Sequence, residues 1–280
     1  IAGVAALNRG EAADALSRFL GALEMARTFA ANDPRLVNSL LNVATAYRRL
    51  GRPDQSEVYY AEAARLQEAA GDPELAVTLD RLGLVLGEQG LAGRATEVFR
   101  DAITRIERIA GPDHPYTAIL LEHLGEALFS LGQFGEATEV YGRIVDIRSR
   151  TFGPDHRSVA PALTRQGLGY IAISRNLDAV QALRRALAIW RVGDQPPTSE
   201  LLLTLEGLVE VSETLGRIRE AADYQLQVVV ARAIDQGERG AVFADELEEY
   251  ARLLRRAGEP GQADEMEDRA ERARLALPRP

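Results

Sequence analysis

Residues 111–147 read GPDHPYTAILLEHLGEALFSLGQFGEATEVYGRIVDI, and this stretch decides the fold. Apolar residues recur at spacings of three and four on both sides of Gly132: Leu121, Leu124, Ala127 and Leu128, then Phe134, Ala137, Val140, Tyr141 and Ile144. That period is typical of amphipathic helices, and a glycine between two such runs is typical of a turn. The stretch therefore predicts a helical hairpin. Because one hairpin cannot bury its apolar faces alone, we expect similar hairpins at a fixed period.

The position that breaks the helices recurs along the whole chain, at steps of 41, 39 and then 42 residues. It is occupied by Gly10, Gly51, Gly90, Gly132, Ser174, Gly216 and Gly258. Five residues after each breaker stands a small residue: Ala15, Ser56, Ala95, Ala137, Ala179, Ala221 and Ala263. A second row, seven residues further on, reads Ala22, Ala63, Ala102, Ile144, Ala186, Val228 and Ala270. Small side chains two turns apart let neighbouring helices approach closely, so the pattern predicts a stack of hairpins.

Composition excludes several classes of protein. The chain has no cysteine, which rules out disulfides and thiolate sites. Its net charge of −9 argues against a general nucleic-acid binder, because neutralising phosphates requires a concentrated basic surface. No apolar run approaches the roughly 18 residues that span a membrane, and no signal peptide opens the chain. We therefore expect a cytoplasmic protein that binds neither nucleic acid nor membrane.

Short connectors are expected between the hairpins. In the stretches 32–34 and 71–73, an aspartate caps the next helix and a proline occupies its first turn. The stretches 111–115 and 153–156 repeat this device, and 193–197 is a looser version.

The two ends of the chain differ from the middle. Residues 1–8 are too short for a full first helix, so we expect an excerpt of a longer chain. The helix expected at 11–30 should turn inward Ala15, Phe19, Ala22, Leu23 and Met25. The helix expected at 261–277 is mostly charged, with an apolar strip of Ala263, Met266, Ala270, Ala273 and Leu277. A stack must end in a helix with one polar face, so this helix is predicted to be a C-terminal cap near the natural C-terminus.

The first helices of the hairpins share a signature of two apolar residues, three apart, followed by a small residue. It reads Leu40-Val43-Ala44, Leu79-Leu82-Gly83, Leu121-Leu124-Gly125 and Leu163-Gln166-Gly167, and more loosely Leu205-Leu208-Val209 and Leu247-Tyr250-Ala251. With the Gly-Pro-Asp-His-Pro connector, the stretch LGQFGEA at 131–137 and RRALAI at 184–189, the chain resembles tetratricopeptide repeats. The resemblance is to the 42-residue kind found in kinesin light chains and many bacterial signalling proteins, and it covers nearly the whole chain.

The expected fold is all-α: a right-handed superhelical solenoid of about seven antiparallel helical hairpins, forming one array over 1–280. The predicted repeat units are 1–32, 33–71, 72–112, 113–154, 155–196, 197–237 and 238–280.

Residues that could carry chemistry are few. His114 and His156 occupy equivalent connector positions, and we interpret each as fixing its own connector, because equivalent sites in adjacent repeats lie too far apart to share a metal. Gly83, Gly87 and Gly90 do not form a phosphate loop, since no strand precedes them. We therefore predict no catalytic residues, no metal site and no cofactor.

One set of residues points to a binding surface. The resemblance implies that the first helices line a concave groove and that the residue two before the small residue faces it. In four consecutive repeats that residue is Asn42, Arg81, His123 and Arg165. Kinesin light chains often have asparagine there, contacting the backbone of a bound peptide.

The rest of that surface indicates its ligand. One turn earlier, a largely apolar row consists of Asn38, Val77, Ile119 and Pro161. Basic and apolar rows together predict a protein or peptide partner with acidic and apolar residues. Glu126 could pair with His123 and cancel part of this charge. In the plainer alternative, these residues are merely exposed and polar.

The sequence thus favours a non-catalytic scaffold that binds a peptide or protein segment in its groove. The alternative is the regulatory or sensing arm of a larger bacterial signalling enzyme, such as a kinase, a STAND-type ATPase or a caspase-like protease. A third hypothesis is catalysis or small-molecule binding by the array itself. Self-association through an open N-terminal end is also compatible with the pattern.

Overall fold

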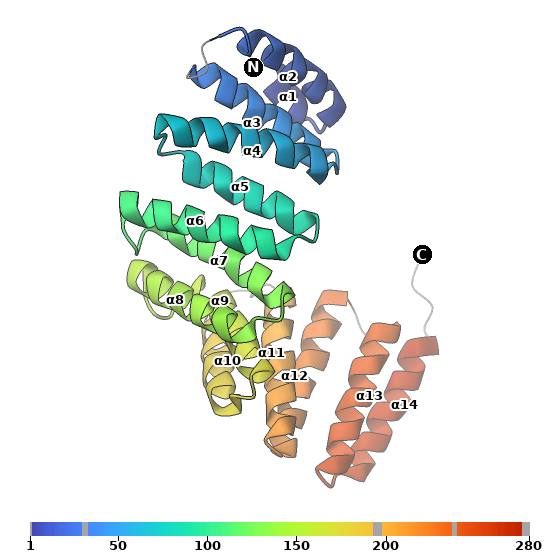
Figure 1. The fold of residues 1–280 in the computed structure, drawn as a ribbon. Helices are drawn as coiled ribbons and strands as arrows, with labels where there is room; N and C mark the ends of the chain where they lie inside the picture. Colours follow the sequence, from blue (N-terminus) through green and yellow to red (C-terminus); the bar gives the residue numbers. More distant parts are fainter. Residues whose placement is uncertain (1, 30–32, 193–197, 237–239, 276–280) are drawn as a thin grey trace. The chain divides into compact units, whose positions relative to one another are not determined.

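A computed structural model describes residues 2–29, 33–192, 198–236 and 240–275 (Figure 1). Within those ranges every regular element is an α-helix, which confirms the all-α prediction. In chain order the helices are α1 (Ala2–Asn8), α2 (Ala12–Ala26), α3 (Pro34–Arg49), α4 (Pro53–Ala70), α5 (Leu75–Glu88), α6 (Ala92–Ala110), α7 (Pro115–Ser130), α8 (Phe134–Phe152), α9 (Val159–Ala172), α10 (Asn176–Arg191), α11 (Thr198–Thr214), α12 (Ile218–Gln236), α13 (Ala241–Arg256) and α14 (Pro260–Leu275). None of these helices is long and apolar enough to cross a membrane.

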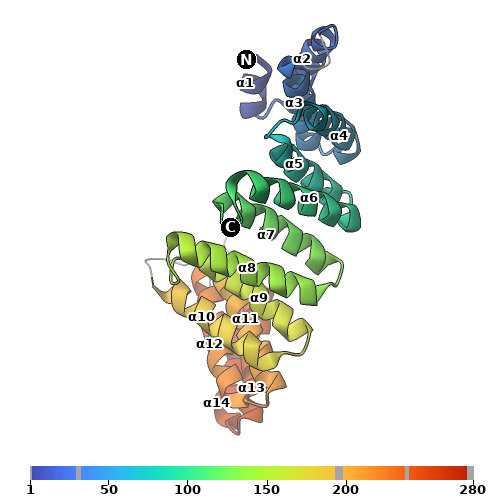
Figure 2. The ribbon, with the colours of Figure 1, turned by 60° about the vertical axis from the view of Figure 1, so that its left-hand side comes forward.

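The chain divides into two compact halves, Ile1–Gln133 and Phe134–Pro280. In the N-terminal half each helix from α1 to α7 packs against the next, and α5 also touches α7. In the C-terminal half the same holds from α8 to α14, and α9 touches α11. Figures 1 and 2 show this order of neighbours within each half. Consecutive packing is the arrangement that the hairpin repeat predicts.

All seven predicted breakers adopt the same backbone conformation. Their φ angles are positive, from 61° at Ser174 to 87° at Gly258. In each turn the following residue donates its amide hydrogen back across the helix end, as in Arg52 to the Tyr47 carbonyl and Arg175 to the Tyr170 carbonyl. This is the six-to-one hydrogen bond of a helix C-cap that requires a left-handed residue, which glycine adopts most easily. The repeat period therefore marks a backbone requirement.

The first row of small residues is confirmed, since all seven members are fully buried. In the second row the prediction is wrong for Ala22, which is exposed, and the inward placement of Met25 is also wrong, since it is 66% exposed. The reason is the length of α1, whose seven residues span only about 10 Å. Such a helix covers the first half of α2, where Ala15 lies, but does not reach its second half.

The small residues of the first helices make room for a large side chain of the partner helix. A Cβ atom placed on Gly83 would lie 2.4 Å from Cε1 of Phe99, and one placed on Gly167 would lie 2.6 Å from Cγ of Leu183. Carbon atoms cannot approach so closely, so the aromatic or leucine side chain occupies the space that a larger residue would need. The small position in the signature is thus set by packing within each hairpin.

Asp33 and Asp72 accept amide hydrogens as predicted, although Pro73 lies before α5, which begins at Leu75. In the connectors 111–115 and 153–156 the acceptor is a histidine instead of the aspartate. Oδ1 of Asp33 accepts a hydrogen bond from the Arg35 amide at 2.9 Å, and Oδ1 of Asp72 accepts one from the Glu74 amide at 2.8 Å. At the start of α7, however, the capping group is His114, whose Nδ1 accepts from the Tyr116 amide at 3.2 Å. Proline at the first helical position makes the residue before it the cap. In the connector 111–115 that residue is histidine.

The last described helix, α14, buries Ala263, Ala270 and Ala273 and leaves Met266 half-buried. Glu267 stands where earlier repeats have a large aromatic residue, and it accepts a hydrogen bond from Nη2 of Arg255 at 2.8 Å. The C-terminal cap itself stays a prediction. The predicted strip residue Leu277 lies outside the described residues, as do Asn32 and the connector 193–197.

Candidate functional site

Four of the five predicted groove residues lie on α3, α5 and α7, the first helices of hairpins in the N-terminal half. We call the side of these helices that carries them the first-helix face. Asn38 and Arg81 are exposed, and Asn42 and His123 are half-buried. The face is formed by Asn38 and Asn42 of α3, Val77 and Arg81 of α5, and Ile119, His123 and Glu126 of α7. In each helix the first two of these residues are four apart, so they lie on one side of it.

Contacts between the first helices hold this face together. Nε of Arg48 on α3 lies 2.7 Å from Oε1 of Glu88 on α5. Asp80 on α5 reaches His123 on α7. Side-chain contacts therefore link α3 to α5 and α5 to α7.

Arg81 is a cation on this face that could pair with a ligand. Its side chain is exposed and makes no hydrogen bond or ion pair with any described residue. Two exposed apolar residues accompany it: Val77, one turn earlier on α5, is 37% exposed, and Ile119 on α7 is 42% exposed. A guanidinium with an apolar border suits a ligand that carries both a carboxylate and apolar side chains.

His123, in contrast, is already engaged. Its Nδ1 lies 2.7 Å from Oδ1 of Asp80, and the hydroxyl of Tyr116 donates a hydrogen bond to Oδ2 of the same carboxylate at 3.0 Å. Asp80 is only 7% exposed. The ring of Phe99 lies against the imidazole, with centroids 5.6 Å apart. His123 is thus one member of a buried polar cluster with Asp80 and Tyr116.

The surroundings shift the pKa of both partners of Asp80. Burial alone would lower the pKa of His123, but the hydrogen bond to Asp80 and the charges of Asp80, Glu126 and Glu122 outweigh it and raise the pKa. Burial, followed by the charge and the hydrogen bond of Asp80, raises the pKa of Tyr116. The tyrosine hydroxyl therefore remains a donor.

Asp80 and Tyr116 were missed by the sequence analysis. Asp80 stands in the helix LAVTLDRLGLVLGE, where it is the first acidic residue and directly follows the apolar Leu79. A carboxylate at such a position needs donors, because a buried charge without hydrogen bonds is strongly unfavourable. That argument could have marked Asp80 as part of a polar cluster, though not which donors it has. The suggested pairing of His123 with Glu126 is replaced by its contact with Asp80.

The fifth predicted residue, Arg165, lies on α9 in the C-terminal half. It is half-buried and makes no hydrogen bond or ion pair with a described residue, and α9 carries no acidic residue. At the corresponding positions of the next two first helices stand Gly207 and Glu249. The basic row therefore does not continue beyond α9.

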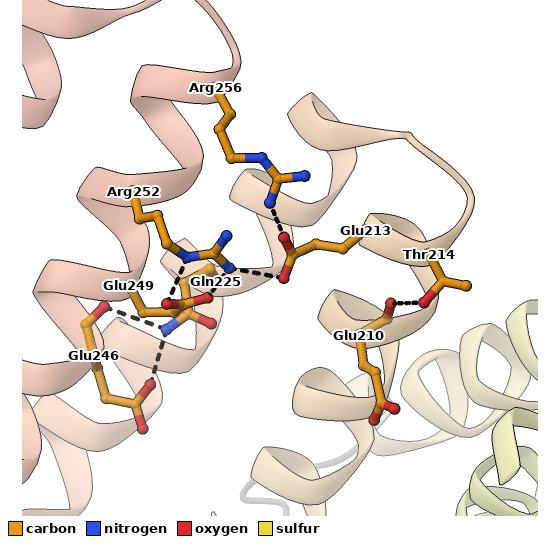
Figure 3. Close-up of polar contacts among 8 residues, drawn as sticks. All are labelled: Glu210, Glu213, Thr214, Gln225, Glu246, Glu249, Arg252 and Arg256. Atoms are coloured by element: carbon orange, nitrogen blue, oxygen red, sulfur yellow. Dashed lines mark hydrogen bonds and ion pairs between the residues drawn. The ribbon is translucent and has the colours of Figure 1, made fainter.

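The first helices that follow, α11 and α13, carry a network of carboxylates and arginines (Figure 3). Nη2 of Arg252 lies 2.9 Å from Oε2 of Glu213, and its Nε lies 2.9 Å from Oε2 of Glu249. Arg256 also pairs with Glu213. In Figure 3 the carboxylate of Glu210 points away from both arginines.

A second set of contacts joins α12 to both of these helices. Arg232 bonds Glu206 at 3.0 Å and Glu246 at 3.1 Å, and Nε2 of Gln225 donates to Glu246 at 2.8 Å. Burial raises the pKa of Glu206, and the neighbouring Glu246 adds to this, although Arg232 opposes it. This surface is rich in carboxylates whose charges are mostly compensated within the protein.

The other two histidines form hydrogen bonds at their own connectors, in line with the interpretation from the sequence. His114 caps α7, as described above. Nδ1 of His156 lies 2.8 Å from the Ser158 hydroxyl, and its ring stacks on Phe152 with centroids 5.1 Å apart. Among the described residues, no three acidic or histidine side chains are grouped so that they could hold a metal ion.

A cavity of about 220 Å³ lies beside the connector between α4 and α5. Its lining consists of Glu68, Gly71, Asp72, Pro73, Leu75, Ala76, Arg105, Arg108 and Ile109. Arg105 pairs with Glu68 and Asp101, both at 2.8 Å, so much of the charge at the rim is compensated. No predicted groove residue lines this cavity.

Comparison with protein families gives one result. The family model of the tetratricopeptide repeat matches residues 1–69, 74–150 and 119–191, which is more than half of the chain. No curated protein sequence matches the chain.

Solved structures with similar folds are repeat proteins. BtubC (BKLC) from P. vanneervenii is 22% identical, with 79% of this chain and 91% of that chain covered and a TM-score of 0.66. The C-terminal part of a TPR repeat-containing protein from Cytophaga hutchinsonii is 16% identical, with 98% and 93% covered and a TM-score of 0.68. A Signal Transduction ATPase with Numerous Domains (STAND) from Pyrococcus horikoshii, which has a tetratricopeptide repeat sensor, is 12% identical, with 96% and 40% covered and a TM-score of 0.73. At these identities the likeness shows the fold alone.

Proposed function

The chain belongs to the tetratricopeptide repeat family, and on that premise we propose that it is a protein-interaction scaffold that binds a peptide or protein segment on its first-helix face. The family supports a role in protein interaction. The choice of the first-helix face rests on its side chains.

One observation carries this proposal: an exposed, unpaired arginine stands within an apolar border. Arg81 is free to pair with a carboxylate of the partner, and Val77 and Ile119 offer apolar area beside it. Asn38 and Asn42 supply amide groups that can both donate to and accept from an extended peptide backbone. The partner is therefore a segment that combines acidic and apolar residues. Arg165 offers a second unpaired cation in the C-terminal half.

A peptide-binding assay tests the proposal. The probes are fluorescein-labelled, N-acetylated heptapeptides with glutamate or aspartate alternating with leucine or valine. Arg81→Glu should weaken binding at least tenfold, or about 1.4 kcal/mol. Wild-type binding should also weaken as salt rises.

The matched control is Arg65→Glu, which reverses an exposed arginine on α4, a second helix of the same half. It should leave the affinity unchanged, and all variants should keep the wild-type melting temperature. Peptide binding that ignores both Arg81→Glu and ionic strength would place the binding surface elsewhere.

A second candidate is the sensing arm of a signalling ATPase. It is favoured by the similar fold of the STAND protein from Pyrococcus horikoshii, in which a region of this size accounts for 40% of the chain and a tetratricopeptide repeat sensor is present. ATP hydrolysis by the product of the complete open reading frame tests this candidate. Hydrolysis that changes when the acidic probes are added would support it, and a product without ATPase activity would exclude it.

A further inference from the structure

His123 of the first-helix face belongs to a polar cluster with Asp80 and Tyr116. Asp80 takes one hydrogen bond from each of two residues on α7. The side chain of Asp80 is 10% exposed and that of His123 is 22% exposed. The imidazole is therefore the member of the pair that reaches the surface where the partner would lie.

The contact with Asp80 determines which nitrogen of His123 is free. A carboxylate accepts only, so Nδ1 must carry the hydrogen atom. In the neutral imidazole Nε2 then has a lone pair, and in the protonated imidazole it becomes a donor. Nε2 makes no hydrogen bond with a described residue. It is the atom that a ligand can address.

Protonation changes what the pair presents to a ligand. With neutral His123 the pair carries the negative charge of Asp80 and offers an acceptor, both of which disfavour a carboxylate. With protonated His123 the pair is neutral overall and offers a charged donor, which favours a carboxylate. Tyr116 does not take part in this change, because its raised pKa keeps the hydroxyl protonated.

Other titratable groups lie around the imidazole. From α5 come Asp80 and Arg81, and from α7 itself come Tyr116, Glu122 and Glu126. The side of α6 that meets His123 presents the uncharged ring of Phe99. Figure 2 shows α5, α6 and α7 as consecutive neighbours. The carboxylates of Asp80, Glu126 and Glu122 favour protonated His123. Arg81 acts on the neighbouring Tyr116, whose pKa its charge lowers.

We propose that Asp80 makes His123 a proton-linked ligand contact, so that an acidic segment bound beside Arg81 takes up a proton at His123. This inference rests on the proposed function and deepens it. Because the ligand prefers the protonated form, binding raises the pKa of His123, and by reciprocity the affinity rises as the pH falls. The gain is complete below the pKa of the free protein and absent above that of the complex.

The experiment measures the affinity of the acidic heptapeptides by fluorescence polarisation from pH 5.5 to 8.5. The probe carboxylates stay ionised over most of this range. We expect wild-type affinity to fall about tenfold from the acidic to the basic end. The dependence should disappear in His123→Gln and remain in the control His114→Asn, because asparagine still caps α7. Calorimetry at pH 7 in buffers of different ionisation enthalpy should show proton uptake on binding.

A second measurement covers the case in which a variant folds poorly. The chain has three histidines, so the imidazole resonance of each can be followed by NMR in the wild-type protein. The pKa of His123 should rise when peptide is added, while those of His114 and His156 stay unchanged. Asp80→Asn should lower the pKa of His123 in the free protein.

The outcomes separate the two proposals. Binding that depends on Arg81 but has the same pH dependence in His123→Gln, or none in the wild type, would overturn the proton linkage and leave the proposed function standing. An absence of binding by any acidic probe at any pH would overturn both.

Discussion

The N-terminal and C-terminal halves share their packing rules but differ on the surface of their first helices. In both halves the first-row small residues are fully buried, for example Ala95 in the N-terminal half and Ala179 in the C-terminal half. At the surface of these helices, the N-terminal half has an unpaired Arg81 with apolar neighbours, whereas Arg252 and Arg256 of α13 both pair with Glu213 of α11. Packing positions recur because every hairpin must stack, while surface positions are free to differ. Binding specificity is therefore expected at the surface positions.

The largest effect should come from the positions that both halves share. Ala95→Leu in the N-terminal half and Ala137→Leu in the C-terminal half force bulk into fully buried helix contacts. Each should lower the free energy of unfolding by about 1 to 3 kcal/mol through overpacking. Urea denaturation followed by far-UV circular dichroism measures the loss.

The matched control is Ala22→Leu. It belongs to the same periodic pattern, but Ala22 is exposed because α1 does not cover it. This change should stay within about 0.5 kcal/mol of the wild type. If only one of the two halves tolerates its leucine, the shared packing rule would be wrong for that half.

The predictable part of the fold is the part that stacking constrains. Breakers and small residues recur because a left-handed turn and a close helix contact each allow few residue types, and such restrictions are visible in a sequence. The contact between Asp80 and His123 is not visible in this way. The two residues lie 43 positions apart, and their meeting depends on how α5 and α7 are rotated and offset.

Burial at the first hairpin could not be predicted from the period either. Ala22 and Met25 follow the apolar pattern, but their exposure depends on the length of the neighbouring helix. The groove residues themselves remain a prediction. Periodicity identifies the side of a helix that faces away from the core. Whether a ligand binds there depends on which charged side chains on that side have no partner within the protein.

Replacing a paired and an unpaired arginine should change the stability by different, smaller amounts. Arg252 bonds two carboxylates, so Arg252→Met should lower the stability by about 1 kcal/mol or less, the usual range for exposed ion pairs. Arg81→Met should change it by less than about 0.5 kcal/mol, because no ion pair is lost. A double-mutant cycle of Arg252→Met with Glu213→Gln measures the pair, and high salt should shrink its coupling energy. If Arg252→Met and Arg81→Met lowered the stability equally, the contrast between paired and unpaired arginines would be wrong.

The smallest predicted effect concerns the one described breaker that is not glycine. Ser174 holds φ at 61°, a conformation that costs an ordinary residue about 1 to 2 kcal/mol. Ser174→Gly relieves this strain but adds about 0.5 to 1 kcal/mol of backbone entropy to the unfolded chain. The C-terminal half should therefore gain about 0.5 kcal/mol.

The reverse change, Gly90→Ser, places the same residue in the equivalent turn of the N-terminal half. Gly90 has φ at 74°, and a Cβ atom there would meet nothing within 4 Å, so the change tests backbone strain without steric contacts. It should cost about 0.5 kcal/mol, equal in size and opposite in sign to Ser174→Gly. Denaturation midpoints of both variants and of the double variant check this, and the double variant should return to the wild-type value. Opposite signs in the two halves would mean that the turns obey one rule, whereas a loss in both variants would show that Ser174 makes a favourable contact that glycine cannot replace.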